Sequence, residues 1–98
     1  MKDSNNEFKS SIWKTIEERV MRALSGIVYN IWGNVGFGTA YKADKNEIEL
    51  VIWDRSCKCN DKKLVVDKIF NYEINKPEYI TVSEIVSLME KYLIENYC

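Results

Sequence analysis

The sequence predicts an α+β fold in which an antiparallel meander of about four strands is flanked by an N-terminal and a C-terminal amphipathic helix, in the order α-β-β-β-β-α. Three observations predict it. Apolar residues recur every three or four positions near both ends of the chain, which is typical of helices with one buried stripe. Between these segments apolar and polar residues alternate, which is typical of strands. The length of 98 residues fits a single α+β domain spanning residues 1–98.

The first helix is predicted from an apolar stripe near the N-terminus. Gly26 stands where a glycine commonly ends a helix. The flank that carries Glu17, Glu18, Arg19 and Arg22 is expected to face water. The predicted stripe consists of Phe8, Ile12, Ile16, Val20, Ala23, Leu24 and Ile27.

Four strands are expected after this helix. Residues 27–32 and 35–42 would form a hairpin, because Gly33-Asn34 has the glycine-first pattern of a two-residue type II′ turn. Residues 43–46 would then turn the chain into a third strand around Leu50. Residues 64–74 also alternate and are expected to form the fourth strand, although a helix through Leu64, Val65, Lys68 and Ile69 is an open alternative.

The last helix is predicted from a capping box and a second apolar stripe. Thr81 precedes the stripe and Glu84 follows three positions later, the arrangement in which the two side chains cap a helix N-terminus. The predicted buried stripe consists of Val82, Ile85, Val86, Met89, Tyr92 and Leu93.

The turn at residues 43–46 fixes which side chains share a face of the sheet. A two-residue and a four-residue loop give the same register, with Gly36 opposite Trp53 and Gly38 opposite Val51. The other face then gathers the main core, from Val28, Trp32, Phe37, Tyr41, Ile48, Leu50 and Ile52.

The face with the glycines is apolar as well. If the first hairpin forms, Ile31 lies beside Gly36 and Tyr29 beside Gly38, so that small residues form a trough between larger walls. Burying apolar surface is favourable by about 25 cal/mol per Å², so both faces should be covered. Either the C-terminal helix fills the trough or a partner does, and interface hot spots are enriched in Trp and Tyr. The predicted partner-binding residues are Tyr29, Ile31, Glu47, Glu49, Val51, Trp53 and Asp54.

The composition argues against several function classes. There is no histidine, so the nucleophile–histidine pairs of many hydrolases are impossible, and we predict no catalytic residues. A carboxylate pair at Glu47 and Glu49 is more typical of a water-facing strand. Cys57, Cys59 and Cys98 are too few for a zinc site without further ligands, so no metal or cofactor is expected. A redox or metal module built on these cysteines is an open alternative.

The charge pattern bears on partners and location. A net charge of −1 argues against nucleic acid as a partner, because affinity for phosphates comes largely from clustered Lys and Arg. No apolar run predicts a membrane span, and residues 1–7 lack the apolar stretch of a signal peptide. We therefore expect a cytoplasmic protein, monomeric in isolation, with a homodimer as an alternative.

The two-helix frame, the small size, the mixed surface charge and a residue usage typical of AT-rich genes together resemble the small immunity proteins of bacterial toxin–immunity pairs, including those of contact-dependent growth inhibition. The resemblance is one of general architecture and covers no defined motif. It implies stoichiometric binding to a toxin domain, such as a nuclease, without turnover. The alternative from another class is a small phage- or plasmid-encoded homo-oligomeric regulator, in which the trough closes on a second copy.

Overall fold

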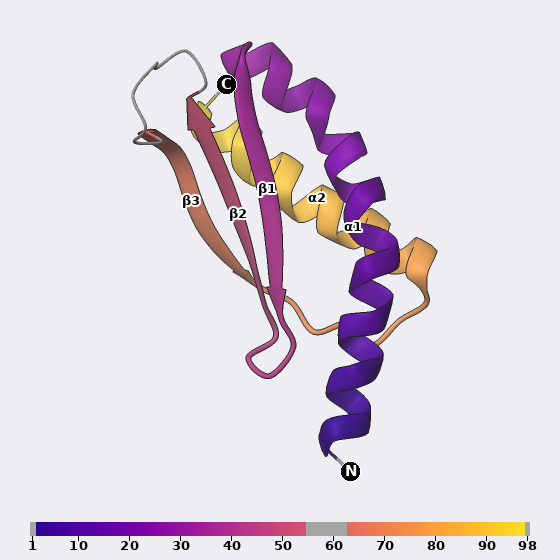
Figure 1. The fold of residues 1–98 in the computed structure, drawn as a ribbon. Coiled ribbons are helices and arrows are strands. Elements are labelled where there is room, and N and C mark those ends of the chain that lie inside the picture. The colour runs from indigo at the N-terminus through magenta and orange to yellow at the C-terminus, as the bar shows by residue number, and fades with distance from the viewer. Residues whose placement is uncertain (1, 55–62, 98) are drawn as a thin grey trace.

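The computed structural model describes residues 2–54 and 63–97, with the side chains of residues 7–54 and 64–97. It confirms the α+β class, but with three strands, in the order α-β-β-β-α (Figure 1). The elements are α1 (Lys2–Trp32), β1 (Val35–Lys42), β2 (Glu47–Asp54), β3 (Lys63–Asn71) and α2 (Glu78–Tyr97).

Helix α1 continues through the residues predicted to form the first strand. Residues 27–32 are helical, and the helix does not end at Gly26. The buried positions Leu24 and Val28 continue a four-residue repeat, and Val28 is only 2% exposed. A glycine inside a helix costs about 1 kcal/mol relative to alanine, which the burial of Val28 can outweigh. The β-branched and aromatic residues of this segment therefore misled the prediction, since tertiary packing overrides strand propensity.

Gly33 ends helix α1 and does not begin a hairpin turn. Its φ angle is 79°, in the left-handed region that glycine adopts readily, and its N–H donates to the carbonyl of Tyr29 at 2.8 Å. Strand β1 starts two residues later, at Val35. The Gly33-Asn34 pair is thus a helix-to-strand connection, and the predicted first hairpin is wrong.

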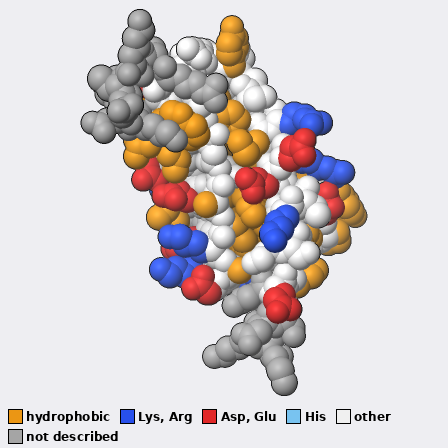
Figure 2. Space-filling view, viewed as in Figure 1, with side chains coloured by type: hydrophobic (Ala, Val, Ile, Leu, Met, Phe, Trp, Pro, Cys, Tyr) orange, Lys and Arg blue, Asp and Glu red, His pale blue; other side chains and the backbone are white. Residues whose placement is uncertain are grey.

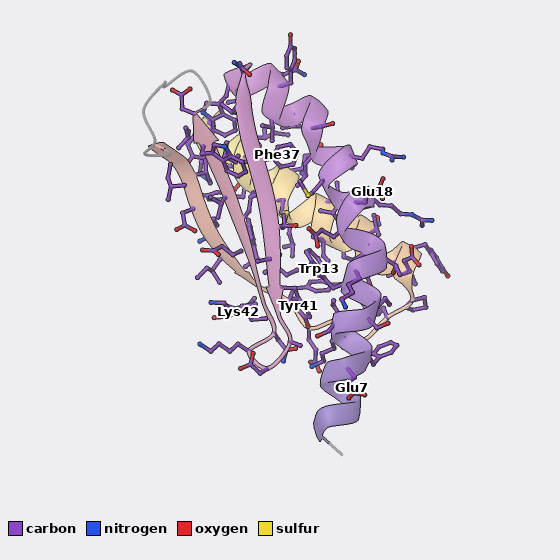
Figure 3. All side chains as sticks on the ribbon, in the orientation of Figure 1. Glu7, Trp13, Glu18, Phe37, Tyr41 and Lys42 are labelled. Carbon is purple, nitrogen blue, oxygen red and sulfur yellow. The ribbon has the colours of Figure 1, made fainter. Side chains whose placement is uncertain are left out.

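The buried stripe of α1 is rotated relative to the predicted one at its N-terminal end. Phe8 is 52% exposed, whereas Lys9 is only 4% exposed and donates from Nζ to Asn46 Oδ1 at 2.7 Å. Trp13 lies one turn further on and contacts the ring of Tyr41 with centroids 5.6 Å apart, as Figure 3 shows between α1 and β1. The observed stripe consists of Lys9, Trp13, Ile16, Val20, Leu24 and Val28.

The three strands form an antiparallel meander in the order β1-β2-β3. The predicted register of the second hairpin is confirmed, with Gly36 opposite Trp53 and Gly38 opposite Val51. The turn at residues 43–46 is confirmed as well, and Asn46 closes it with a φ of 52°. The fourth predicted segment is a strand and not a helix, but it ends at residue 71 where the prediction ran to 74.

Both helices pack on one face of the sheet, which we call the inner face. Its central strand contributes Ile48, Leu50 and Ile52, all fully buried. They belong to one hydrophobic core with the stripe of α1 and with the buried residues Ile85, Met89 and Leu93 of α2. In Figure 1, α2 passes behind the sheet while α1 runs beside β1. The opposite, outer face carries no helix within the described residues.

Helix α2 begins earlier than the capping box predicted. It starts at Glu78, directly after Pro77, so that Thr81 lies inside the first turn. The Thr81 hydroxyl is buried and donates to the carbonyl oxygens of Lys76 and Pro77 at 3.0 and 2.9 Å. A proline fits the start of a helix because it lacks an N–H, and here it precedes the first helical residue. The predicted stripe is confirmed at Ile85, Met89 and Leu93, with Val82, Val86 and Tyr92 partly buried beside it.

Candidate functional site

The outer face of the sheet is a grid of four rows fixed by the two strand registers. Each row takes one residue from β1, one from β2 and one from β3. From the end next to residues 55–62 towards the turn at 43–46, the rows are Gly36-Trp53-Leu64, Gly38-Val51-Asp67, Ala40-Glu49-Ile69 and Lys42-Glu47-Asn71. The two helices lie behind this grid, so its side chains project away from the core.

The Trp53 indole lies across strand β1 at Gly36. A methyl group built at the Cα of Gly36 would stand 2.5 Å from the indole ring, which is a clash, whereas one at Gly38 would stand 3.8 Å from it. The absence of a side chain at Gly36 therefore lets the ring lie close to the backbone. The small residues Gly36, Gly38 and Ala40 do lie in one row of a paired strand, and Trp53 covers the end of that row at Gly36.

Apolar side chains continue beside Trp53 on the outer face. Leu64 is 52% exposed and Ile69 is 47% exposed, while Val51 between them is partly buried. Figure 2 shows hydrophobic side chains over β2 and β3, interrupted by acidic ones, with lysines towards the 43–46 turn. We call the set Ala40, Val51, Trp53, Leu64 and Ile69 the outer patch.

Two carboxylates lie next to each other within the outer patch. Glu49 on β2 and Asp67 on β3 are diagonal neighbours across the strand pair. The hydrogen bond that a protonated Glu49 can donate to Asp67, together with the repulsion from the Asp67 charge, raises the pKa of Glu49 above its ordinary value. Lys42 on β1 acts in the opposite direction. Such a hydrogen bond needs a proton held between the two carboxylates, and like charges in this position otherwise destabilise a sheet.

The structure divides the predicted partner-binding residues into three groups. Glu47, Glu49, Val51 and Trp53 share the outer face, as predicted. Asp54 pairs with Val35, one position beyond Trp53, so the alternation along β2 assigns it to the inner side. Whether any of them binds a partner stays a prediction.

Tyr29 and Ile31 are not on the outer face, because they belong to α1 and not to a fourth strand. Ile31 packs against the core. Tyr29 is 71% exposed and borders a groove of about 420 Å³ between α1 and β1. The groove is lined by Ser25, Gly26, Val28, Tyr29, Gly33, Val35 and Phe37. The wall that Tyr29 and Ile31 were expected to add to the trough is therefore absent, and β1 is an edge strand.

The predicted site residues included none of the β3 residues that lie on the outer face. Leu64, Asp67 and Ile69 lie beside Trp53, Val51 and Glu49 only because of the register between β2 and β3. The alternation of residues 64–74 signals a strand, but a long connection does not fix a register as a tight turn does. The register is also shifted next to Ile52, where β3 accommodates one extra residue.

A polar cluster at the connection between β3 and α2 joins the two elements. Tyr72 donates from its hydroxyl to Glu84 Oε1 at 2.5 Å, and Lys76 donates to Oε2 of the same carboxylate at 2.8 Å. These bonds lower the pKa of Glu84, whereas burial and the bond to Glu84 raise the pKa of Tyr72 to about 12. A groove of about 550 Å³ lies beside the cluster. Because the three groups satisfy one another, the cluster serves to fix α2.

In residues 2–54 and 63–97, no three His, Cys, Asp or Glu side chains are grouped so that they could hold a metal ion. Cys57, Cys59 and Cys98 lie outside the described residues. In the same ranges neither helix combines the length and the apolar character needed to cross a membrane.

No protein-family model, curated protein sequence or solved structure matches this chain.

Proposed function

We propose that this protein is a non-catalytic binding module that uses the outer face of its sheet to dock a protein partner. One observation carries the proposal: the outer patch is apolar and partly exposed, and within the described residues no helix lies on it. A partner that covered this surface would gain about 25 cal/mol of binding free energy for each Å² of apolar surface that it buried. Exposed apolar surface that is bordered by polar groups commonly marks an interaction site.

The arrangement of the outer patch suits a binding site better than an active site. Trp53 lies at one end of the patch, where the absence of a side chain at Gly36 lets the ring pack closely against β1. A ring held in place loses little conformational entropy on binding, which is one reason why Trp dominates interface hot spots. The carboxylates at its centre are open to water, so they lack the enclosed environment that tunes catalytic groups.

Within this class, we propose that the partner is a bacterial toxin domain and that binding neutralises it. The resemblance to small immunity proteins supports this choice, together with an acidic outer face that would suit a basic enzyme such as a nuclease. Opposite charges on the two surfaces would speed association. Inhibition would be stoichiometric and would need no cofactor.

The proposal is tested with the product of the gene next to the one that encodes this chain, because immunity genes lie beside their toxin genes. Expressing the neighbouring product alone should arrest bacterial growth, and coexpression of this chain should restore it. Calorimetry on the purified pair should show a one-to-one complex. If the neighbouring product neither harms growth nor binds this chain, the toxin assignment is wrong.

The Trp53→Ala variant tests the site itself. We expect it to weaken the complex by about 2 kcal/mol or more, which is roughly thirtyfold in Kd, as for other aromatic hot spots. Tyr79→Ala is the matched control, because Tyr79 is 72% exposed on α2, away from the outer face. If Trp53→Ala keeps a wild-type circular dichroism spectrum and binds with unchanged affinity, the outer patch is not the docking site.

A further inference from the structure

The outer face is unbalanced in charge. Its four rows carry the carboxylates of Glu47, Glu49 and Asp67 and the single cation of Lys42. Lys42 lies directly opposite Glu47, in the row nearest the turn. The Glu49 and Asp67 carboxylates are diagonal neighbours in the middle of the outer face, and the hydrogen bond that a protonated Glu49 can donate to Asp67, with the repulsion from the Asp67 charge, raises the pKa of Glu49.

The repulsion between Glu49 and Asp67 lowers the stability of the strand pair, and the fold does not require carboxylates at these two positions. Like charges on neighbouring strands oppose pairing, and a Thr or Gln at either position would keep the strand pair without the repulsion. A surface that docked a purely apolar partner would also have to desolvate both carboxylates without compensation. A cation on the partner resolves both problems, because an Arg or Lys side chain can donate charge-assisted hydrogen bonds to both carboxylates.

We infer that the partner of the outer face is a protein surface that presents an Arg or Lys side chain to the Glu49–Asp67 pair, next to an apolar side chain that packs on Val51 and Trp53. This inference rests on the proposed function and specifies the chemistry of its partner. The cation stabilises the ionised form of Glu49, so a Glu49 side chain that is protonated in the free protein loses its proton to solvent when the complex forms. Binding therefore strengthens as the pH rises through the titration of Glu49. The charged groups that face this titration are Asp67, Lys42 and Glu47.

The same charges argue against a second copy of this chain as the occupant. Two outer faces packed together would bring three carboxylates and one lysine against an identical set. With the acidic pair near the centre of the grid, a two-fold axis there would place two such pairs in contact. Like charges across an interface cost affinity, which a basic partner avoids.

The first experiment uses a short alternating Arg-Leu peptide with five residues as the probe, titrated into the isotope-labelled protein and followed by amide chemical shifts. We expect the shifts to concentrate at Val51, Trp53 and Ile69, and the affinity to increase between pH 4 and pH 7. The same peptide with citrulline in place of arginine keeps the shape and loses the charge. It should bind roughly fivefold more weakly at pH 7, the size expected for a few exposed ion pairs.

The E49Q/D67N variant removes the pair, and E90Q/E95Q on α2 removes the same charge elsewhere. Only E49Q/D67N should abolish the preference for arginine and the pH dependence. Equal binding of both peptides to the wild-type protein would overturn the inference, as would a dimer of the wild-type protein that Trp53→Ala dissociates. A toxin complex that is sensitive to Trp53→Ala but not to E49Q/D67N would also overturn it, while leaving the proposed function intact.

Discussion

The two faces of the sheet are built from the same three strands but differ in how far their side chains are buried. On the inner face Ile48, Leu50 and Ile52 are completely buried beneath two helices. On the outer face Leu64 and Ile69 remain about half exposed, although they are as hydrophobic as their inner counterparts. The comparison shows that hydrophobicity alone does not say which face of a strand becomes the core. The positions of the helices decide it, and in the described residues both helices, α1 and α2, cover the inner face.

The connection between β3 and α2 explains why both helices pack on the inner face. After β3 the chain turns inward at Ile74, which is 1% exposed and belongs to the core. The N–H of Tyr72 donates to the carbonyl of Asn46 at 2.9 Å, which ties this connection to the 43–46 turn. Helix α2 therefore starts on the inner side, where α1 already lies.

The largest difference between the faces should appear on truncating neighbouring residues of β2. Leu50→Ala on the inner face should lower the free energy of unfolding by about 2–5 kcal/mol, since it leaves a cavity in the core. Val51→Ala on the outer face should lower it by about 1 kcal/mol or less, because Val51 is only partly buried. Urea denaturation of the two variants measures both values. Equal losses would contradict the assignment of the faces.

The next largest effect concerns the contact between Trp53 and β1. Gly36→Ala should destabilise the protein by about 1–3 kcal/mol, because the added methyl group would stand 2.5 Å from the indole and force the ring to move. Gly38→Ala is the matched control and should change stability by no more than about 0.5 kcal/mol, since its methyl group makes an ordinary contact. Thermal unfolding separates the two variants. A harmless Gly36→Ala would show that the ring does not lie on Gly36.

A smaller effect tests the length of α1, on which the absence of a fourth strand depends. Gly26→Ala should stabilise the protein by about 0.5–1 kcal/mol, because Gly26 is inside the helix with open space around its Cα. Gly33→Ala should instead destabilise it by about 1–2 kcal/mol, because its φ is 79°. Melting temperatures measure both shifts. The reverse pattern would mean that the helix ends at Gly26.

The smallest effect concerns the acidic pair. The folded protein raises the pKa of Glu49, so folding favours its protonated form and the ionised form opposes folding above that pKa. Glu49→Gln should therefore raise the melting temperature at pH 7, and the gain should disappear as the pH falls below the pKa of Glu49. Melting curves between pH 3 and pH 8 test this, with Glu90→Gln as the control. A gain that is independent of pH would contradict the raised pKa of Glu49.

Local patterns were sufficient for part of the fold and of the site. The register of β1 and β2 followed from a tight turn, so Gly36, Val51 and Trp53 could be assigned to one face in advance. The prediction failed at residues 27–32, where β-branched and aromatic residues favour a strand locally but Val28 completes a helical stripe. It could not find Asp67, because the residue meets Glu49 only through a register that no tight turn fixes.

The sequence by itself determined the α+β class, the antiparallel hairpin and the two apolar faces of the sheet, because these depend on periodicities of two and 3.6 residues that short segments carry alone. The tertiary structure decided the number of strands, the length of α1 and the face that stays uncovered. These depend on which distant segments bury one another most completely, and that is a property of the whole packed chain.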